Sequence, residues 1–115
     1  MIASLFMSTP AYAKSKIKQV DAGFNKTFIL RENGNFEYTK PFGSYGEGNI
    51  SNVQQIMAVG RDGYIALLKD GTVTRSSTYY NSGINWTNIK QIDTNTDTSG
   101  DLVVGLREDG TGSEE

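Results

Sequence analysis

The sequence predicts an all-β fold built from tandem copies of one small antiparallel sheet, and three observations lead to this prediction. One short segment occurs three times, as Ile17–Val20, Val53–Ile56 and Ile89–Ile92, and its closing apolar residues are spaced 36 residues apart. A second segment, an apolar run that ends in Asn-Gly or Asp-Gly, follows each copy. The apolar runs have strand length, because Gly or Asn interrupts them every few residues. A fixed period in this range is typical of stacked supersecondary units.

The first thirteen residues differ from the repeats. The apolar run Ile2–Met7 is broken at Pro10, and Ala11 and Ala13 are small residues at the positions that signal peptidase reads before Lys14. We expect residues 1–13 to be the remainder of a signal peptide; a first strand or a disordered leader are the alternatives. No other stretch approaches the ~20 apolar residues that span a bilayer. The sequence therefore predicts a secreted or cell-surface protein with no membrane association after signal cleavage.

The first repeat is expected over residues 14–51. Its strands follow in order as the Ile17–Val20 segment, Phe28–Leu30 and Phe36–Tyr38, with Asn33-Gly34 between the last two. A segment rich in Gly, Ser and Tyr, Pro41–Asn49, then returns the chain, either as a short fourth strand or as a loop.

The second repeat, expected over residues 52–87, has the same order. Val53–Val59 is followed by a turn, by the strand Tyr64–Leu68, by Asp70-Gly71 and by a β-branched run at Thr72–Thr74. Ser76–Asn85 is the return segment.

The third repeat, expected over residues 88–115, is predicted to be partial. It has the opening segment and the central strand, and Asp109-Gly110 follows. We expect the chain to end at Glu114 and Glu115, where the third strand should begin.

The Asx-Gly pairs predict two-residue hairpins. Both residue types tolerate the positive φ that a type I′ turn requires, and each pair separates two apolar runs. The predicted turn residues are Asn33, Gly34, Asp70, Gly71, Asp109 and Gly110.

A sheet of three or four short strands cannot bury both faces alone, so neighbouring copies are expected to stack. Radial stacking would give a β-propeller and linear stacking a solenoid. Leu67–Val73 (Leu-Leu-Lys-Asp-Gly-Thr-Val), Leu106–Thr111 and Trp86–Ile92 resemble the regulator-of-chromosome-condensation repeat. The resemblance implies propeller blades and favours the secreted bacterial branch, which includes the propeller-type β-lactamase inhibitory protein. The family's Trp-Gly-x-Asn segment is absent after Val73.

Two and a half to three blades cannot close a ring of typically 4–8 blades. The prediction is therefore tandem propeller blades in an incomplete ring. A fragment of a longer propeller, self-assembly of several chains into one ring, and an open arc are the three alternatives.

Composition narrows the function classes. The chain has no His and no Cys, which removes the usual zinc ligands, the Cys nucleophile and the disulfide framework. Its formal net charge is −2, with no basic stripe for a phosphate backbone, so nucleic acid is not an expected partner. No cofactor or metal is predicted, and no carboxylate pair is indicated for catalysis. Glu37 and Glu47 have no evident partner in the sequence.

The segment Asp93–Asp101 places carboxylate and amide oxygens at alternate positions, as many calcium loops do. Thr98 stands where the sharp-turn Gly belongs, and Val104 where the bidentate Glu belongs. A polar surface insert is therefore the preferred interpretation.

Aromatic residues of the return segments are the candidate contacts for a protein partner. Aromatic side chains on Gly-, Ser- and Asn-rich loops offer large contact area at low entropy cost. The candidates are Phe42, Tyr45, Tyr79 and Tyr80, whereas Trp86 is expected to pack between repeats because Ile50 holds the equivalent place.

These observations favour a non-catalytic protein-recognition scaffold, with inhibition of an extracellular enzyme implied by the resemblance. A carbohydrate-binding or glycosidase-type propeller and a structural cell-surface spacer are the alternatives.

Overall fold

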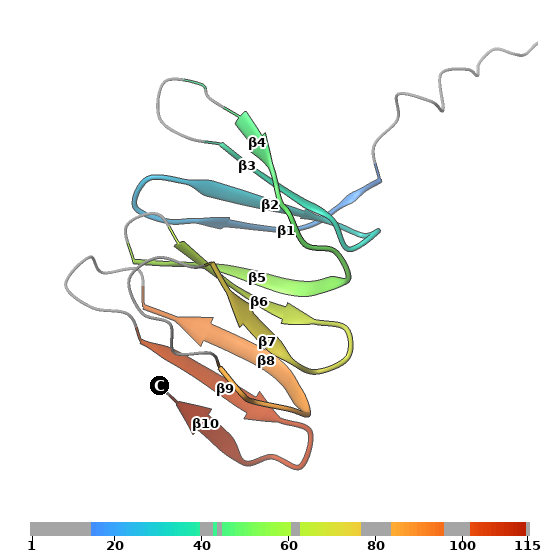
Figure 1. The fold of residues 1–115 in the computed structure, drawn as a ribbon, viewed down its shortest axis with the longest axis vertical. Helices are drawn as coiled ribbons and strands as arrows, with labels where there is room; N and C mark the ends of the chain where they lie inside the picture. Colours follow the sequence, from blue (N-terminus) through green and yellow to red (C-terminus); the bar gives the residue numbers. More distant parts are fainter. Residues whose placement is uncertain are drawn as a thin grey trace, which may run out of the picture.

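The computed structural model of the chain describes residues 15–39, 43, 45–60, 63–76, 84–95 and 102–114. Three antiparallel sheets stack on one another (Figure 1), and no α-helix occurs among the described residues. The first sheet contains β1 (Ile17–Ala22), β2 (Thr27–Arg31), β3 (Phe36–Thr39) and β4 (Tyr45–Glu47). The second contains β5 (Val53–Val59), β6 (Gly63–Leu68) and β7 (Val73–Arg75), and the third contains β8 (Ile89–Thr94), β9 (Val103–Arg107) and β10 (Gly112–Glu114).

The all-β prediction of tandem small sheets is confirmed. Each repeat forms one sheet whose central strand is the apolar run before the Asx-Gly pair, and this strand pairs with a strand on either side. In the first repeat the return segment does form a fourth strand, since β4 pairs with β3. The prediction that the third repeat stops before its third strand was wrong. Gly112 and Ser113 are weak strand formers, yet β10 pairs with β9 from Gly112–Leu106 to Glu114–Val104.

The first strand of every sheet carries a bulge at the same place. The register shifts between Ile17 and Gln19, between Val53 and Gln55, and between Ile89 and Gln91. A bulge re-aims the side chain that follows it. The three glutamines are therefore equivalent residues of the repeat.

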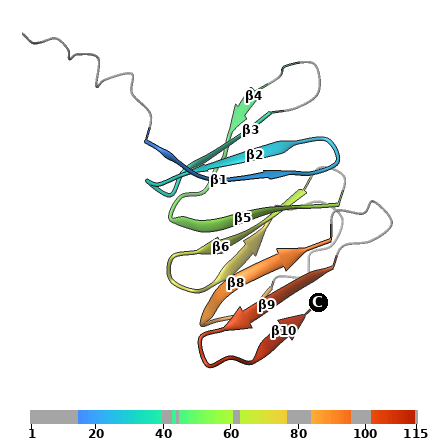
Figure 2. The same ribbon diagram turned by 180° about the vertical axis from the view of Figure 1, so that it is seen from behind.

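These bulges direct two glutamine side chains onto the next sheet. The Gln19 amide accepts a hydrogen bond from Ile56 N at 2.9 Å and donates one to Ile56 O at 2.6 Å. Gln55 does the same with Ile92 N at 2.9 Å and Ile92 O at 2.7 Å. We call these paired contacts the glutamine bridges. They join β1 to β5 and β5 to β8, which succeed one another down the stack (Figure 2).

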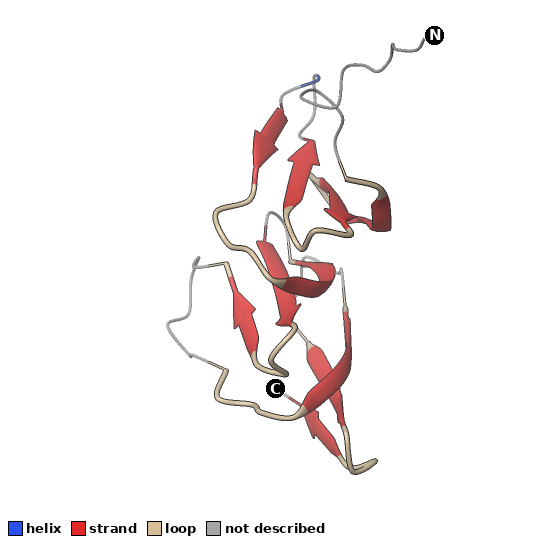
Figure 3. Cartoon of the chain, turned by 90° about the vertical axis from the view of Figure 1, so that its right-hand side faces the viewer, coloured by secondary structure: helices blue, strands red, loops and turns tan. Residues whose placement is uncertain are grey.

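Two apolar clusters fill the spaces between the sheets, which lie one above another in the side view (Figure 3). The cluster between the first and second sheets contains Phe28, Leu30, Phe36, Val53, Ile56, Ala58 and Ala66. The cluster between the second and third contains Val59, Ile65, Leu67, Val73, Ile84, Ile89, Ile92 and Val103. Trp86 packs against the latter and Ile50 against the former, which confirms that both fill equivalent places between repeats.

The hairpins have a different geometry from the predicted type I′ turn. Positive φ occurs at Gly34, Gly71 and Gly110, with values of 87°, 85° and 88°, and at none of the preceding Asx residues. In the first hairpin Gly34 N donates to Arg31 O, and Arg31 N donates to Asn35 O. This is a three-residue loop in which a turn is followed by glycine in the left-handed region, as in a G1 bulge. The Asx side chain acts by hydrogen bonding and does not need a left-handed backbone.

No helix in the described part of the chain is long and apolar enough to cross a membrane.

Candidate functional site: an aromatic groove between the first two sheets

Of the aromatic residues predicted to contact a partner, Tyr45 is the one whose place the structure describes. Phe42, Tyr79 and Tyr80 lie outside the described residues. Tyr45 begins β4, the edge strand of the first sheet, and its side chain is 52% exposed. An exposed aromatic ring on an edge strand fits the predicted contact role, since it offers apolar area beside open backbone groups.

Close to β4, a groove lies between the first and second sheets. Its walls come from β2, β3, β4, β6 and β7 and from the connections beside them. The lining residues are Lys26, Phe28, Tyr38, Glu47, Gly48, Asn49, Ile50, Tyr64, Thr74, Arg75 and Ser76. A wall that combines rings with cations and amides is typical of surfaces that recognise other molecules.

Three aromatic rings line this groove, those of Phe28, Tyr38 and Tyr64, and Phe36 packs against two of them. Phe28 lies 6.3 Å from Phe36, 6.2 Å from Tyr38 and 5.9 Å from Tyr64, measured between ring centroids. Phe36 and Tyr64 meet edge to face at 5.1 Å. Such tilted pairs stabilise beyond the area that they bury, so the groove has a rigid base.

Polar groups of the groove contact both tyrosines, one at its ring and the other at its hydroxyl. Lys26 Nζ lies 4.7 Å from the centroid of the Tyr38 ring, within the range of a cation–π contact. The Tyr64 hydroxyl donates a hydrogen bond of 3.2 Å to Asn49 Oδ1. Burial raises the pKa of Tyr64, because desolvation disfavours the phenolate. Tyr64 is therefore a neutral hydrogen-bond donor at neutral pH.

Two glycines let β4 and the connection that follows it pass close to these rings. A Cβ at Gly46 would lie 2.3 Å from the Tyr38 ring, and a Cβ at Gly48 would lie 2.3 Å from the Phe36 ring. Both distances are far below van der Waals contact, so only glycine fits without displacing a ring. The Gly-rich return segment is thus a steric requirement of the aromatic groove.

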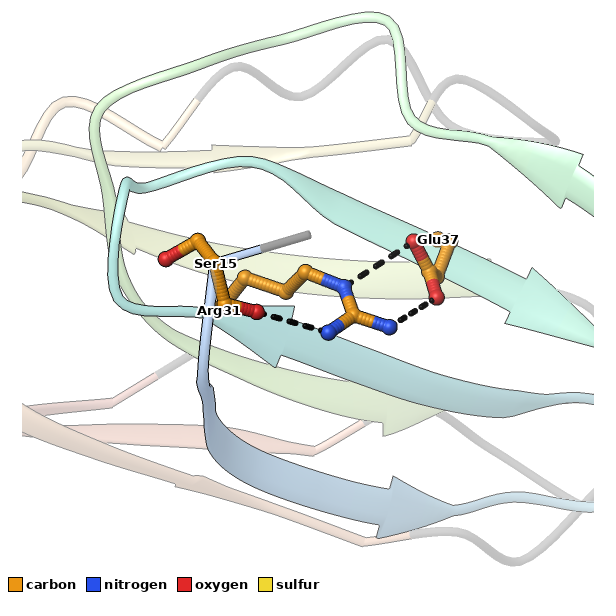
Figure 4. A network of polar contacts seen from close by, with 3 residues as sticks. All are labelled: Ser15, Arg31 and Glu37. Carbon is orange, nitrogen blue, oxygen red and sulfur yellow. Dashed lines mark hydrogen bonds and ion pairs between the residues drawn. The ribbon is translucent and has the colours of Figure 1, made fainter. Parts of the chain in front are cut away.

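Beside this groove lies a second depression. It contains a partly buried ion pair between Arg31 and Glu37 (Figure 4). Arg31 Nη2 lies 2.7 Å from Glu37 Oε1, and Arg31 Nε lies 3.3 Å from Glu37 Oε2. Arg31 Nη1 also donates to Ser15 O at 2.7 Å. The hydrogen bond that Arg31 donates to Glu37 is the largest cause that raises the pKa of Arg31. The sequence did not reveal this pair, because Arg31 and Glu37 meet only when the hairpin folds.

Glu37 also faces Glu47 across the β3–β4 pair. Arg31 supplies the positive charge that offsets two carboxylates at neighbouring places of one sheet. Arg31 donates hydrogen bonds to both oxygens of Glu37, so the guanidinium fixes this carboxylate in the sheet.

Sequence reasoning missed Tyr38 and Tyr64 as groove residues. Both belong to predicted strands, whereas the candidate contact residues were predicted in the return segments. Alternation along the strands could have found them, since Tyr38 lies two residues from Phe36 and shares its face.

The predicted calcium segment is described only at its start. Asp93 Oδ1 accepts a hydrogen bond from Thr94 N at 2.9 Å, and residues 96–101 lie outside the described residues. Within the described ranges, no three His, Cys, Asp or Glu side chains lie together as a metal site would require.

No family model, curated protein or solved structure matches this chain.

Proposed function

We propose that this chain is a non-catalytic protein-recognition unit of a secreted repeat β-propeller, and that the aromatic groove and Tyr45 contact the partner. The observation that carries the proposal is the preformed groove with aromatic walls and a charged rim. The exposed Tyr45 lies at the same edge strand, with its side chain on the other face of β4 from Gly46, which meets the Tyr38 ring. Large rigid rings surrounded by polar groups are characteristic of the centres of protein interfaces.

The propeller architecture is proposed from the repeats. Three sheets of the same strand order stack through equivalent glutamine bridges, and the Asp-Gly-Thr-Val segment resembles that of the regulator-of-chromosome-condensation repeat. Secretion or display at the cell surface is proposed from residues 1–13, and an extracellular enzyme is the class of partner that the resemblance implies.

The absence of turnover is supported by the state of the carboxylates. A glycosidase needs two carboxyl groups converging on one bond, one of them able to donate a proton. Glu37 and Glu47 are cross-strand neighbours, but Arg31 binds both oxygens of Glu37. This arrangement favours recognition over catalysis.

The main competitor is a carbohydrate-binding module, because sugars also stack on aromatic rings. Lys26 lies over the ring of Tyr38, and the Tyr64 ring packs against Phe28 and Phe36. These contacts occupy ring surface that a sugar would need, so a protein is the preferred partner.

The proposal can be tested with a photo-crosslinking amino acid placed at Tyr45, and at Lys90 as the control. Lys90 is exposed on β8, away from the groove. Bacterial extracellular proteins are the probe, and a glycan array is run in parallel. We expect a discrete protein adduct at position 45 that unlabelled wild type suppresses and unlabelled Tyr45→Ala does not.

Equal labelling at positions 45 and 90 would contradict the proposed site. Glycan binding that Tyr45→Ala abolishes would favour the carbohydrate-binding alternative. The lack of both protein and glycan binding would leave the structural spacer as the better account.

A further inference from the structure

The two interfaces between sheets are built from the same residues of the repeat, so the outer faces can be compared with them place by place. On the side facing the following sheet, the central strand contributes Phe28 and Leu30 in the first repeat and Ile65 and Leu67 in the second. These four side chains are at most 1% exposed. Val104 and Leu106 hold the same places in the third repeat, where Val104 is 40% exposed and Leu106 is partly exposed. We call the outer side of the third sheet the C-face.

The outer side of the first sheet, the N-face, shows the complementary feature. Val53 and Ile56 of β5 pack against the first sheet, and Ile89 and Ile92 of β8 pack against the second. All four side chains are at most 3% exposed. Ile17 and Val20 are the equivalent residues of β1 and are 53% and 61% exposed. The N-face thus presents the apolar pair that the other two interfaces cover.

The C-face also carries the equivalents of the polar groups that hydrogen-bond to the next sheet in the two interfaces inside the chain. Gln91 follows the same bulge as Gln19 and Gln55, and its side chain is exposed. Gly34 O and Gly71 O accept hydrogen bonds of 3.0 Å from Val53 N and Ile89 N. Gly110 is the equivalent glycine, and nothing lies within 4 Å of a Cβ built on it.

The N-face carries the matching backbone groups. The bridges from Gln19 and Gln55 end on the N–H and C=O of Ile56 and Ile92. Val20 is the equivalent residue and pairs with Ile29 in the same register in which Ile56 pairs with Ala66. Its N–H and C=O therefore point to the same open edge of the sheet. The N–H of Ile17 corresponds to that of Val53, which Gly34 O binds.

We propose that a second copy of this chain docks its N-face on the C-face of the first, so that the stack continues across the chain boundary. Gln91 would bridge to the backbone of Val20 of the second copy, Gly110 O would accept from Ile17 N, and Val104 would pack on Ile17 and Val20. The occupant is specified by continuity with the two interfaces inside the chain, because the bridges recognise the backbone spacing of this repeat's own first strand.

This contact joins two different faces, so it is heterologous. Each chain retains one unused face after pairing, and association can therefore continue beyond the dimer. That property separates the proposal from a symmetric dimer, in which the same patch of both chains would be used up.

The test is sedimentation of the full 115-residue chain over a concentration series, with one variant of each face. Val104→Arg places a charge on the C-face, and Val20→Glu places one on the N-face. Both side chains are exposed, so both variants are expected to keep the wild-type circular dichroism spectrum and urea midpoint. We expect the wild type to associate with increasing concentration and each variant alone to stay monomeric.

Mixing the two variants supplies the decisive observation. The Val104→Arg chain keeps an intact N-face, and the Val20→Glu chain keeps an intact C-face. An equimolar mixture is therefore expected to form a 1:1 dimer and nothing larger.

Gln91→Ala tests the bridge without adding a charge, and Lys90→Ala on the neighbouring exposed residue is its matched control. Because Gln91→Ala loses two hydrogen bonds, we expect it to raise the dissociation constant of the association about tenfold or more. Lys90→Ala should match the wild type.

A wild-type chain that stays monomeric would overturn the proposal. Association that persists in both face variants, or a mixture that fails to dimerise, would overturn it equally, because the contact would then lie elsewhere or be symmetric. Tyr45 pairs with Thr39 and lies on the same face of the first sheet as Ile17 and Val20. The crosslinking at Tyr45 is therefore run at a concentration at which the chain is monomeric, and an adduct with the mass of two copies of the chain reports the face contact, whereas an adduct of any other mass reports an outside partner.

Discussion

The carboxylate of Asp70 organises its hairpin by accepting two hydrogen bonds from Thr72, from the backbone N at 3.0 Å and from the hydroxyl at 2.6 Å. Asp109 accepts the same pair from Thr111, at 2.9 and 2.7 Å. Hydrogen bonds to the ionised form favour it, so both carboxyl groups have a pKa below the ordinary value of 3.8. The Thr of Asp-Gly-Thr therefore stabilises the turn through its hydrogen bonds to Asp, in addition to leading into the next strand.

Replacing Thr72 by Val should raise the pKa of Asp70 toward 3.8, because the side-chain hydrogen bond is the largest cause of the lowered value. Thr72→Ser keeps the hydroxyl and should keep the low pKa. A titration of the carboxyl carbon by NMR measures both. An unchanged midpoint in Thr72→Val would show that the backbone N–H alone holds the carboxylate.

The same carboxylate gives the hairpin a dependence on pH. With the pKa lowered by folding, the stabilising contribution is complete above about 3.8, the unfolded value, and is lost as the pH falls through the lower folded value. We therefore expect the contribution of Asp70 to the free energy of unfolding to be lost only below about pH 3.8. The loss should be smaller in Thr72→Val, where the pKa of Asp70 is closer to its unfolded value. Urea denaturation at a series of pH values measures both.

Among the strands, the edge strands β1, β5 and β8 do more than pair with a neighbour. Their bulges turn Gln19 and Gln55 toward the next sheet, where the side-chain amide replaces a peptide group as hydrogen-bonding partner. An open sheet edge leaves backbone N–H and C=O groups unpaired. The glutamine bridges satisfy one such residue in each interface.

Substitution Gln55→Ala should lower the free energy of unfolding by about 1–3 kcal/mol, because it removes two partly buried hydrogen bonds and leaves the backbone of Ile92 without them. Urea denaturation measures the loss. Gln54→Ala is the matched control, since Gln54 is the exposed neighbour on the bulge and should change stability by no more than about 0.5 kcal/mol. Equal effects of the two substitutions would contradict the role of the bridge.

Substitutions at the hairpin glycines Gly71 and Gly110 can distinguish the cost of a strained backbone from the cost of a clash between sheets. Gly71 and Gly110 share the same positive φ, but a Cβ at Gly71 would lie 3.3 Å from Asn88 Cα, whereas nothing lies within 4 Å at Gly110. Gly110→Ala should cost about 1–2 kcal/mol from the left-handed backbone alone. Gly71→Ala should cost more in the same urea assay. Equal losses would mean that Asn88 moves aside without cost.

In the part of the chain that the structure describes, the sheets form a stack in which the main contacts join successive sheets. The middle sheet is covered on both faces, and Ile65, Ala66 and Leu67 of β6 are at most 1% exposed. In β9 Val103 is buried and Val104 is 40% exposed. Stability in such a stack is approximately a sum of repeat and interface terms, so the terminal sheets are the less stable ones.

Hydrogen exchange should therefore be slowest in β6 and faster in the central strands of the terminal sheets, β2 and β9. Opening a terminal sheet breaks one interface, whereas opening the middle sheet breaks two. Exchange measured amide by amide at low protein concentration, where copies do not associate, tests this order. Uniform protection of all three central strands would indicate one cooperative unit instead.

Much of the fold was predictable because it depends on local patterns. The three-fold repeat, the central strands and the place of the Asx-Gly hairpins follow from apolar runs and turn residues. The predicted type I′ turn was wrong. Asn33 and Asp70 stabilise their loops through side-chain hydrogen bonds, and within each hairpin loop only the glycine has a positive φ. β10 was missed because Gly112 and Ser113 carry no strand signal of their own, and pairing with β9 overrides propensity.

The candidate site was predictable only in part. Tyr45 was identified from the composition of its segment, and it lies exposed on β4. The ring cluster around Tyr38 and Tyr64 and the Arg31–Glu37 pair join residues from different strands or sheets. No local pattern contains such contacts, because they depend on how the sheets stack.

The sequence by itself determined the repeat, the all-β class and the order of strands within each sheet, because these depend on apolar spacing and turn chemistry within about ten residues. Only the tertiary structure decided which face of each sheet meets which neighbour. That choice rests on bulges that aim Gln19 and Gln55 across 37 residues of chain, on glycines that admit a neighbouring ring or backbone, and on aromatic rings that meet between sheets. Those contacts join segments distant in sequence, and their geometry exists only after the sheets have packed.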